Sequence, residues 1–425
     1  MPVPLRVLIC LVLALLPYSR AWSHPMPSTE VRLRLKDDGI EARLLLPIIE
    51  LKLGWQKPLP MSAKETVAQY GEELKGYVTA HIHPTAPDGR PWTVVIRSVT
   101  PIEEQIPDVQ VDAVLVPPPG APADKLTLDY DVILHQLITH SAIVSIEKDW
   151  RNGLIDGKPI LLGTLTDVSH RIDIDRSRGS WFQGFKAVFV LGMRHIAEGT
   201  DHLLFLLALL LPVPLVVTAG RWGGPDSTPS SLKKILKVVT AFTLGHSITL
   251  LLGATGWVRL PSRPVEICIA LSIFVSALHA LRPLFLRREA LIAAGFGLVH
   301  GLAFASTLTE IGFGPATLAL SILGFNLGIE VVQLLVVAVT VPWLLLLSRT
   351  RFYSPFRVGG AAMAAIASLG WLLERLTGAS NRVTVVVEVL ARHAIWFLAG
   401  LAVYAIVATL LSRKTKVPQE DIAAP

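Results

Sequence analysis

Seven long apolar segments occupy this 425-residue chain from residue 182 onward. Each segment is close to or longer than the roughly 20 residues with which an α-helix crosses a bilayer. Hydrophobic residues make up 52% of the chain and charged residues 17%, which is typical of a polytopic membrane protein. The predicted transmembrane segments are residues 182–212, 235–254, 264–283, 289–308, 316–347, 357–376 and 390–412.

Basic residues concentrate in every second loop between these segments. Cytoplasmic loops carry such an excess of lysine and arginine. The pattern therefore predicts a bacterial inner-membrane protein with a cytoplasmic tail (413–425) and an N-terminal domain on the opposite side. The same loops account for the net charge of +6, so nucleic-acid binding is not indicated. They contain Lys233 and Lys234, Arg287 and Arg288, Arg349 and Arg351, and Arg413 and Lys414.

A signal peptide and a strand-rich domain are predicted before the helices. Residues 1–23 combine an arginine, an apolar stretch and small residues at the spacing of a cleavage site. Residues 24–180 contain short alternating segments separated by proline and glycine, which is typical of β-strands. The expected strands are 31–36, 40–47, 92–100, 109–117, 125–134, 141–148 and 159–166, with one helix over 62–79.

The predicted fold class is therefore α+β. An extracytoplasmic β-sandwich-like domain is followed by a polytopic seven-helix transmembrane bundle over residues 181–412. The chain contains two cysteines, Cys10 and Cys268. Because Cys10 lies in the predicted signal peptide, the exported domain is expected to fold without a disulfide. Thiolate metal sites are likewise excluded for a monomer.

One polar run, RHIAEGTDH, interrupts the first apolar segment and begins at Arg194. A charged side chain at mid-bilayer costs at least about 2.5–3.5 kcal/mol, so such side chains are expected to face one another, water or an ion. On a continuous helix, His195, Glu198 and His202 share one face. Arg194 and Asp201 line the adjoining strip. One interpretation is a metal site, and the alternative is a salt-bridge network around Arg194 that only fixes helix packing.

Polar residues recur at similar depths in three later segments. His246 lies in the second, His300 in the fourth, and Asn326 with Glu330 in the fifth. All are expected near the middle of the bilayer, so one shared site is geometrically feasible. Imidazole and carboxylate groups are suitable ligands for nickel, cobalt, copper or zinc, and a carboxylate also orients a histidine ligand. The predicted metal ligands are His195, Asp201, His202, His246, His300, Asn326 and Glu330, and the residues expected around them are Arg194, Glu198 and Ser247.

The exported domain contains histidines of its own. His81 and His83 alternate, as neighbours on one face of a strand do, and His135 and His140 are five residues apart. His24 would lie at or near the N-terminus after signal cleavage. We expect these side chains to be solvated, with metal capture as the alternative.

The chain resembles the HupE/UreJ family of hydrogenase- and urease-associated membrane proteins. The resemblance covers roughly residues 180–345 and rests on four runs, RHIAEGTDHLLFLLALLL, FTLGHSITLLL, GLVHGLAFA and LGFNLGIEVVQLLVV. It implies a nickel-linked role, for which nickel permeation is the usual proposal.

The chain is also similar to the nickel/cobalt permeases, with two departures. Their first signature has four residues between His and Asp-His, whereas five separate His195 from Asp201 here. One extra residue rotates His195 by about 100° on a helix. Asn326 stands where the permeases have an aspartate, which removes a charge from the site.

These observations predict a permease for a divalent transition metal, with nickel as the first candidate, and they do not predict an enzyme. No Gly-rich phosphate loop is present in the sequence, so ATP-driven pumping is not indicated. Two other classes remain open: an intramembrane metalloenzyme, and an accessory factor that docks a protein partner through its exported domain. Besides such a partner, the expected contacts are the metal ion and the lipid bilayer.

Overall fold

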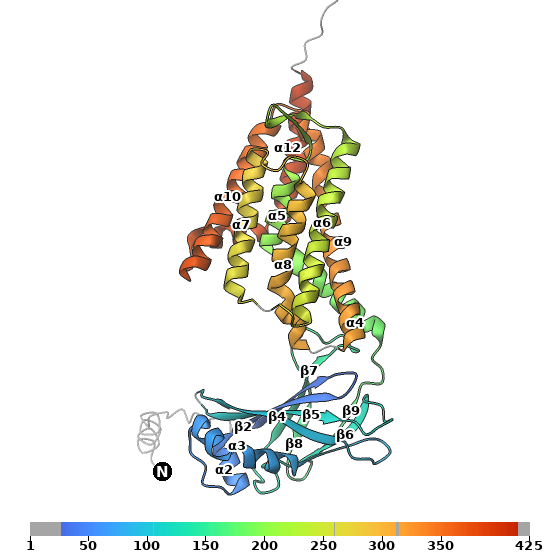
Figure 1. Cartoon of the computed structure of the whole chain (residues 1–425), viewed down its shortest axis with the longest axis vertical. Helices are drawn as coiled ribbons and strands as arrows, with labels where there is room; N and C mark the ends of the chain where they lie inside the picture. Colours follow the sequence, from blue (N-terminus) through green and yellow to red (C-terminus); the bar gives the residue numbers. More distant parts are fainter. Residues whose placement is uncertain (1–26, 105, 259, 312–313, 415–425) are drawn as a thin grey trace, which may run out of the picture.

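A sheet domain and a helix bundle follow one another along the chain, and they lie at opposite ends of the molecule (Figure 1). The computed structural model describes residues 27–414 except 105, 259 and 312–313. The predicted signal peptide and residues 415–425 of the predicted tail lie outside the described residues. The prediction of an α+β chain with an N-terminal sheet domain and several apolar helices is confirmed.

The sheet domain is built from two sheets and two helices around one core. Residues of both sheets and of both helices, including Leu33, Leu128, Leu51 and Leu74, belong to a single buried cluster. The larger sheet has the strand order β4(Thr93–Ile102), β5(Asp108–Val116), β2(Ile40–Pro47), β1(Thr29–Leu35), β7(Ala142–Asp149) and β8(Ile160–Leu165). The smaller has the order β3(Ile82–Thr85), β6(Lys125–Tyr130) and β9(Arg171–Asp175), and the helices are α2(Ile48–Trp55) and α3(Ala63–Thr79).

The alternation read from the sequence is visible in β1, where Val31, Leu33 and Leu35 are buried and the residues between them are half-exposed. One predicted strand is too long. The segment 125–134 was expected to be extended, but β6 ends at Tyr130 and a turn begins at Asp131. Strands β3 and β9 were not predicted because each has only four or five residues.

The helix bundle begins at Trp181. Five of its described helices are long and apolar enough to cross a membrane: α6, α7, α9, α10 and α12. The chain is therefore a multi-pass membrane protein, while the count of seven spans stays a prediction. The elements are α4(Trp181–Glu198), α5(Thr200–Leu210), β10(Leu215–Thr218), β11(Arg221–Pro225), α6(Thr228–Ala254), α7(Ser262–Leu281), α8(Glu289–Ile311), α9(Pro315–Ser348), α10(Tyr353–Thr377), α11(Arg382–Arg392) and α12(Ala394–Lys414).

The first predicted segment, 182–212, is not one helix. It divides at Gly199, whose backbone is extended (φ −73°, ψ 92°), so α4 ends at Glu198 and α5 begins at Thr200. A Cβ at this position would lie 2.6 Å from the carbonyl oxygen of His195 and 2.8 Å from Nδ1 of His202. The absence of a side chain at Gly199 therefore lets the two histidine-bearing turns fold toward each other.

Glycines also bring two pairs of helices into backbone contact, as small residues do in membrane proteins. A Cβ on Gly297 of α8 would lie 2.1 Å from the carbonyl oxygen of Phe242 in α6. A Cβ on Gly328 of α9 would lie 2.1 Å from the carbonyl oxygen of Phe189 in α4. Helices α6 and α8 run side by side in Figure 1. These contacts place the polar residues of neighbouring helices within reach of one another.

Candidate metal site

Three histidines from three helices meet inside the bundle. One ring nitrogen from each of His195 (α4), His202 (α5) and His246 (α6) lies within 4.8 Å of the other two. The ring centroids of His195 and His202 are 4.6 Å apart, and those of His195 and His246 are 6.2 Å apart. His202 and His246 are buried. Three imidazoles in this arrangement form a ligand set for a borderline divalent metal.

Asp201 orients the central histidine. Its Oδ1 lies 2.9 Å from Nδ1 of His202 and also accepts a hydrogen bond from the His202 backbone N–H. A carboxylate accepts hydrogen bonds, so Nδ1 carries the proton and Nε2 keeps the lone pair. That Nε2 is buried and has no hydrogen-bond partner among the described residues. Asp201 thus acts as an orienting carboxylate behind a histidine whose free nitrogen suits a metal.

His300 of α8 extends the cluster on the other side of His202, with ring centroids 5.0 Å apart. The Ser272 hydroxyl donates to the carbonyl of Ile269 (2.7 Å), so it accepts from Nε2 of His300 at 3.1 Å. The lone pair of His300 is therefore on Nδ1, which is buried and has no partner in the described part of the chain. Like His202, His300 has one ring nitrogen held by a hydrogen bond and the other buried without a described partner. It lies outside the three-histidine group.

Aromatic rings enclose these histidines. The ring centroids of Phe205 and Phe242 each lie 5.2 Å from that of His300, and the Phe325 centroid lies 5.4 Å from that of His195. A buried polar atom without a partner costs roughly 1–3 kcal/mol. Several such nitrogens within one apolar enclosure are consistent with a site for a cation that pairs with them.

The structure places the two remaining predicted ligands differently. Asn326 lies beside His246 and donates from Nδ2 to the carbonyl of Ile322 (2.8 Å), while its buried Oδ1 has no described partner. Its contact with His246 is not aligned as a regular hydrogen bond, because both ring nitrogens of His246 stay without such a bond within the described residues. Glu330, one turn further along α9, is half-buried and is not part of the histidine group.

The three residues expected around the site are exposed or make other contacts. Arg194 is 61% exposed, and its described ion pair is with Asp156 of the sheet domain at 3.8 Å. Glu198 is exposed, although it follows His195 by three residues in the same helix, α4. Ser247 donates to the carbonyl of Thr243 in its own helix. The alternative, a buried salt-bridge network around Arg194, is therefore not found among the described ion pairs.

Sequence reasoning missed several residues that shape the site. Ser272 fixes the tautomer of His300, and the Thr243 hydroxyl donates to Oε1 of Gln333 at 3.2 Å, which links α6 to α9. Gln333 lies seven residues after Asn326 and so shares its helical face. That spacing was a usable signal for Gln333. Phe205, Phe242 and Phe325 carried no signal, because aromatic residues are common in apolar helices.

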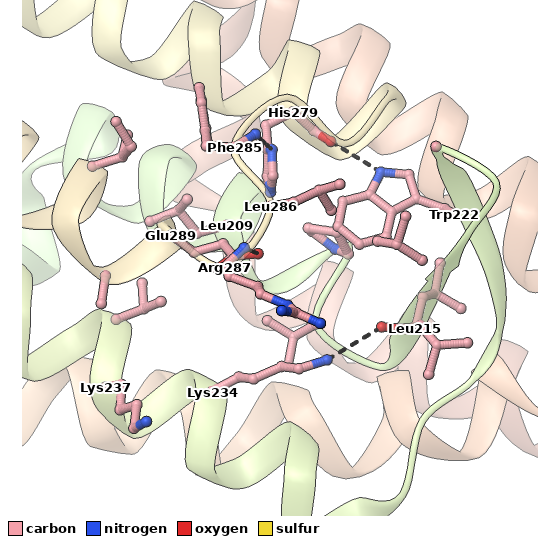
Figure 2. A pocket seen from close by; sticks show the side chains of 18 of the residues that line it. Leu209, Leu215, Trp222, Lys234, Lys237, His279, Phe285, Leu286, Arg287 and Glu289 are labelled. Atoms are coloured by element: carbon pink, nitrogen blue, oxygen red, sulfur yellow. Dashed lines mark hydrogen bonds between the residues drawn. The ribbon is translucent and has the colours of Figure 1, made fainter.

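A separate pocket of about 740 Å³ lies next to the β10–β11 hairpin and contains none of these residues. Figure 2 shows Lys234, Lys237 and Arg287 around it, with Nε1 of Trp222 donating to the carbonyl of His279. His279 is buried and accepts at Nδ1 from the Leu284 N–H. The pocket therefore marks a basic cavity elsewhere in the bundle and is not the histidine site.

Comparison with known proteins identifies the membrane part. A family model described as HupE / UreJ protein matches residues 171–375. The matched segment contains every residue of the histidine cluster. Neither the curated proteins nor the solved structures contained a significant match. The resemblance read from the four sequence runs is confirmed by this match, which supports assigning the membrane part of the chain, residues 171–375, to the HupE/UreJ family.

Proposed function

We propose that this protein is a membrane permease for a divalent transition metal, with nickel as the first candidate. The observation that carries the proposal is the meeting of His195, His202 and His246 inside apolar helices, with one ligand atom from each within 4.8 Å of the others. Membership of the HupE/UreJ family supports a membrane role in nickel or cobalt transport, or an accessory role.

The ligand set suits a transported ion. Imidazoles select nickel, cobalt, copper and zinc over magnesium and calcium, which prefer oxygen ligands. Among the described residues, one carboxylate, that of Asp201, contacts the histidines, and it acts on the ring of His202 from behind. His300 and Asn326 flank the group and would receive the ion on either side. The basic loops support an orientation with the sheet domain outside the cytoplasm.

An intramembrane metalloenzyme is the less favoured candidate. Catalytic metal sites combine an open coordination position with a general base. Glu198 is exposed and Glu330 lies outside the histidine group, so the described residues offer no carboxylate base at the cluster besides Asp201. An accessory factor would bind a protein partner through the sheet domain.

Uptake of labelled nickel tests the proposal. We expect His202→Ala to lower uptake at least tenfold, both in cells and in liposomes containing the purified protein. His393→Ala is the matched control, because that histidine is exposed between α11 and α12. Normal uptake by His202→Ala would refute the site. Bound nickel without transport in liposomes would favour an accessory or enzymatic role.

A further inference from the structure

The sheet domain contains a second group of metal-ligating side chains, apart from the bundle. One ligand atom from each of His81, Asp131 and His135 lies within 4.8 Å of the other two. We propose that these residues bind a second divalent transition-metal ion on the surface of the sheet domain. The chemical class is that of nickel, copper, zinc and cobalt, for which two imidazoles are suitable ligands, with the Asp131 carboxylate orienting the His81 ring from behind.

The register of the smaller sheet brings His81 and Asp131 together. Ile82 of β3 pairs with Tyr130 of β6, so His81 and Asp131 occupy the adjoining positions just beyond the paired strands. The Asp131 N–H donates to the His81 carbonyl at 3.1 Å. The Asp131 carboxylate lies 2.8 Å from Nδ1 of the His81 ring. Both side chains are thus held by regular sheet pairing.

A turn with a strained backbone at Ile133 brings His135 next to His81 and Asp131. Ile133, which is fully buried, has φ +69°, a conformation that β-branched residues rarely adopt. Its N–H donates to the hydroxyl of Tyr77 (3.1 Å), and the backbone of Gly54 lies against it. The turn stacks the His135 ring on that of His81, with centroids 4.0 Å apart and planes 14° apart.

Both rings present the same nitrogen. Nδ1 of His81 faces the Asp131 carboxylate, and Nδ1 of His135 lies 3.0 Å from the Asp131 backbone carbonyl. Neither oxygen can donate, so both Nδ1 atoms carry protons and both Nε2 atoms keep lone pairs. Neither Nε2 has a hydrogen bond in the described part of the chain. Asp131 therefore fixes both tautomers, as the oxygens behind metal-bound histidines do.

Exposure distinguishes this group from ordinary buried polar residues. The His81 and Asp131 side chains are 22% and 33% exposed, and His135 is exposed. The ring of Tyr77 packs against that of His81, with centroids 4.8 Å apart. The ring of Trp55 stacks on that of Tyr77, with centroids 5.1 Å apart. A metal from solution can therefore reach the two rings, which would tilt to direct both Nε2 lone pairs at one ion, and keep water at its remaining positions.

The other described histidines of the domain, His83, His140 and His170, are not part of the group, and Nδ1 of His170 lies 2.6 Å from the Asp129 carboxylate. His83 lies in β3, two residues after His81. It is exposed, whereas its neighbour Ile82 is buried. His140 is buried, with Nε2 at 2.8 Å from the Thr29 hydroxyl and Nδ1 at 3.4 Å from the Glu50 carboxylate. His83→Ala is therefore a matched control two residues from His81.

Nickel titration of the full-length protein, purified in detergent without a histidine tag, tests this inference. The background is His202→Ala, which disables the bundle cluster, so the outcome does not depend on transport. We expect one bound nickel in this background and in the additional variant His83→Ala. Adding His81→Ala and His135→Ala should weaken that binding at least 100-fold. Unchanged binding in this variant, or an equal loss in His83→Ala, would overturn the proposal.

A single substitution in the exposed turn provides a second measurement if the double variant does not fold. His135→Asn keeps the polarity of the turn and removes one imidazole. X-ray absorption of bound nickel should then show one imidazole ligand where the His202→Ala background shows two. An unchanged imidazole count would contradict the assignment of His135.

Discussion

His202 and His246 are buried in the helix bundle, where each comes from a different helix and the rings meet among phenylalanines. His81 and His135 in the sheet domain are half-exposed or exposed, and one strand pairing and one turn bring them together. In both places an aspartate holds a histidine through Nδ1. The same kind of pair is therefore enclosed in the bundle, at Asp201 and His202, and open to solvent in the sheet domain, where Asp129 and His170 form a further example.

The two settings depend on different parts of the structure. The bundle cluster depends on close helix approach at glycines, whereas the sheet cluster depends on the β3–β6 register and the Ile133 turn. Damage to one is therefore expected to leave the other intact. The following predictions test this independence, beginning with the largest effect.

Gly297→Val should separate α6 from α8, because even the first added carbon would lie 2.1 Å from the carbonyl oxygen of Phe242. We expect a loss of at least about 3 kcal/mol in the free energy of unfolding and loss of nickel from the bundle. Nickel at His81 and His135 should remain. Thermal unfolding in detergent and nickel titration measure both effects. Gly295→Val is the control, since a Cβ there meets no atom within 4 Å.

Acid should destabilise the sheet domain through His140. Burial lowers the pKa of His140 to about 4, whereas an unfolded histidine titrates near 6.5. Between these values the unfolded chain binds a proton that the folded chain does not. The contribution of His140 to the free energy of unfolding is therefore fully present above about pH 6.5. It decreases by up to about 3 kcal/mol as the pH falls toward 4.

The neighbouring Glu50 opposes this effect, because burial raises the pKa of its carboxyl and favours its protonated form in the folded chain. Hydrogen exchange of β1 and β7, corrected for the intrinsic rate at each pH, measures the balance. In His140→Gln the loss of protection between pH 6.5 and 4 should become smaller. Equal pH profiles for the variant and the wild type would contradict the assignment.

Asp201→Asn should weaken nickel binding in the bundle by about 10–100-fold, the usual effect of removing an orienting carboxylate. The amide can present its nitrogen to Nδ1 of His202 and favour the wrong tautomer. Nickel titration in a background with His81→Ala and His135→Ala isolates this site. Affinity equal to wild type would show that Asp201 does not orient the ring.

Glu198→Gln should change almost nothing. Its side chain is exposed at the last residue of α4, so nickel affinity in the bundle should stay within twofold and the free energy of unfolding within about 0.5 kcal/mol. The same titration and unfolding measurements apply. A large loss of nickel affinity would return Glu198 to the site and contradict the geometry of the break.

Sequence reasoning located most of the bundle cluster because polar residues are costly in apolar segments and therefore conspicuous. His195, Asp201, His202, His246, His300 and Asn326 were all selected, and the structure brings them into one neighbourhood. Glu198 was expected beside them but is exposed at the last residue of α4, and the continuous helix expected through Gly199 is broken there. In the sheet domain the polar background is high, so no single histidine stood out.

The sequence by itself determined the order of the chain, from strand-rich domain to apolar helices, and the family of its membrane part. These features follow from local periodicity, composition and short motifs. Only the tertiary structure decided which side chains meet: His195 with His202 across the break at Gly199, and His81 with His135 rather than His83. Such pairings depend on one backbone conformation, at Gly199 or Ile133, and on contacts between distant segments, neither of which leaves a periodic signal in the sequence.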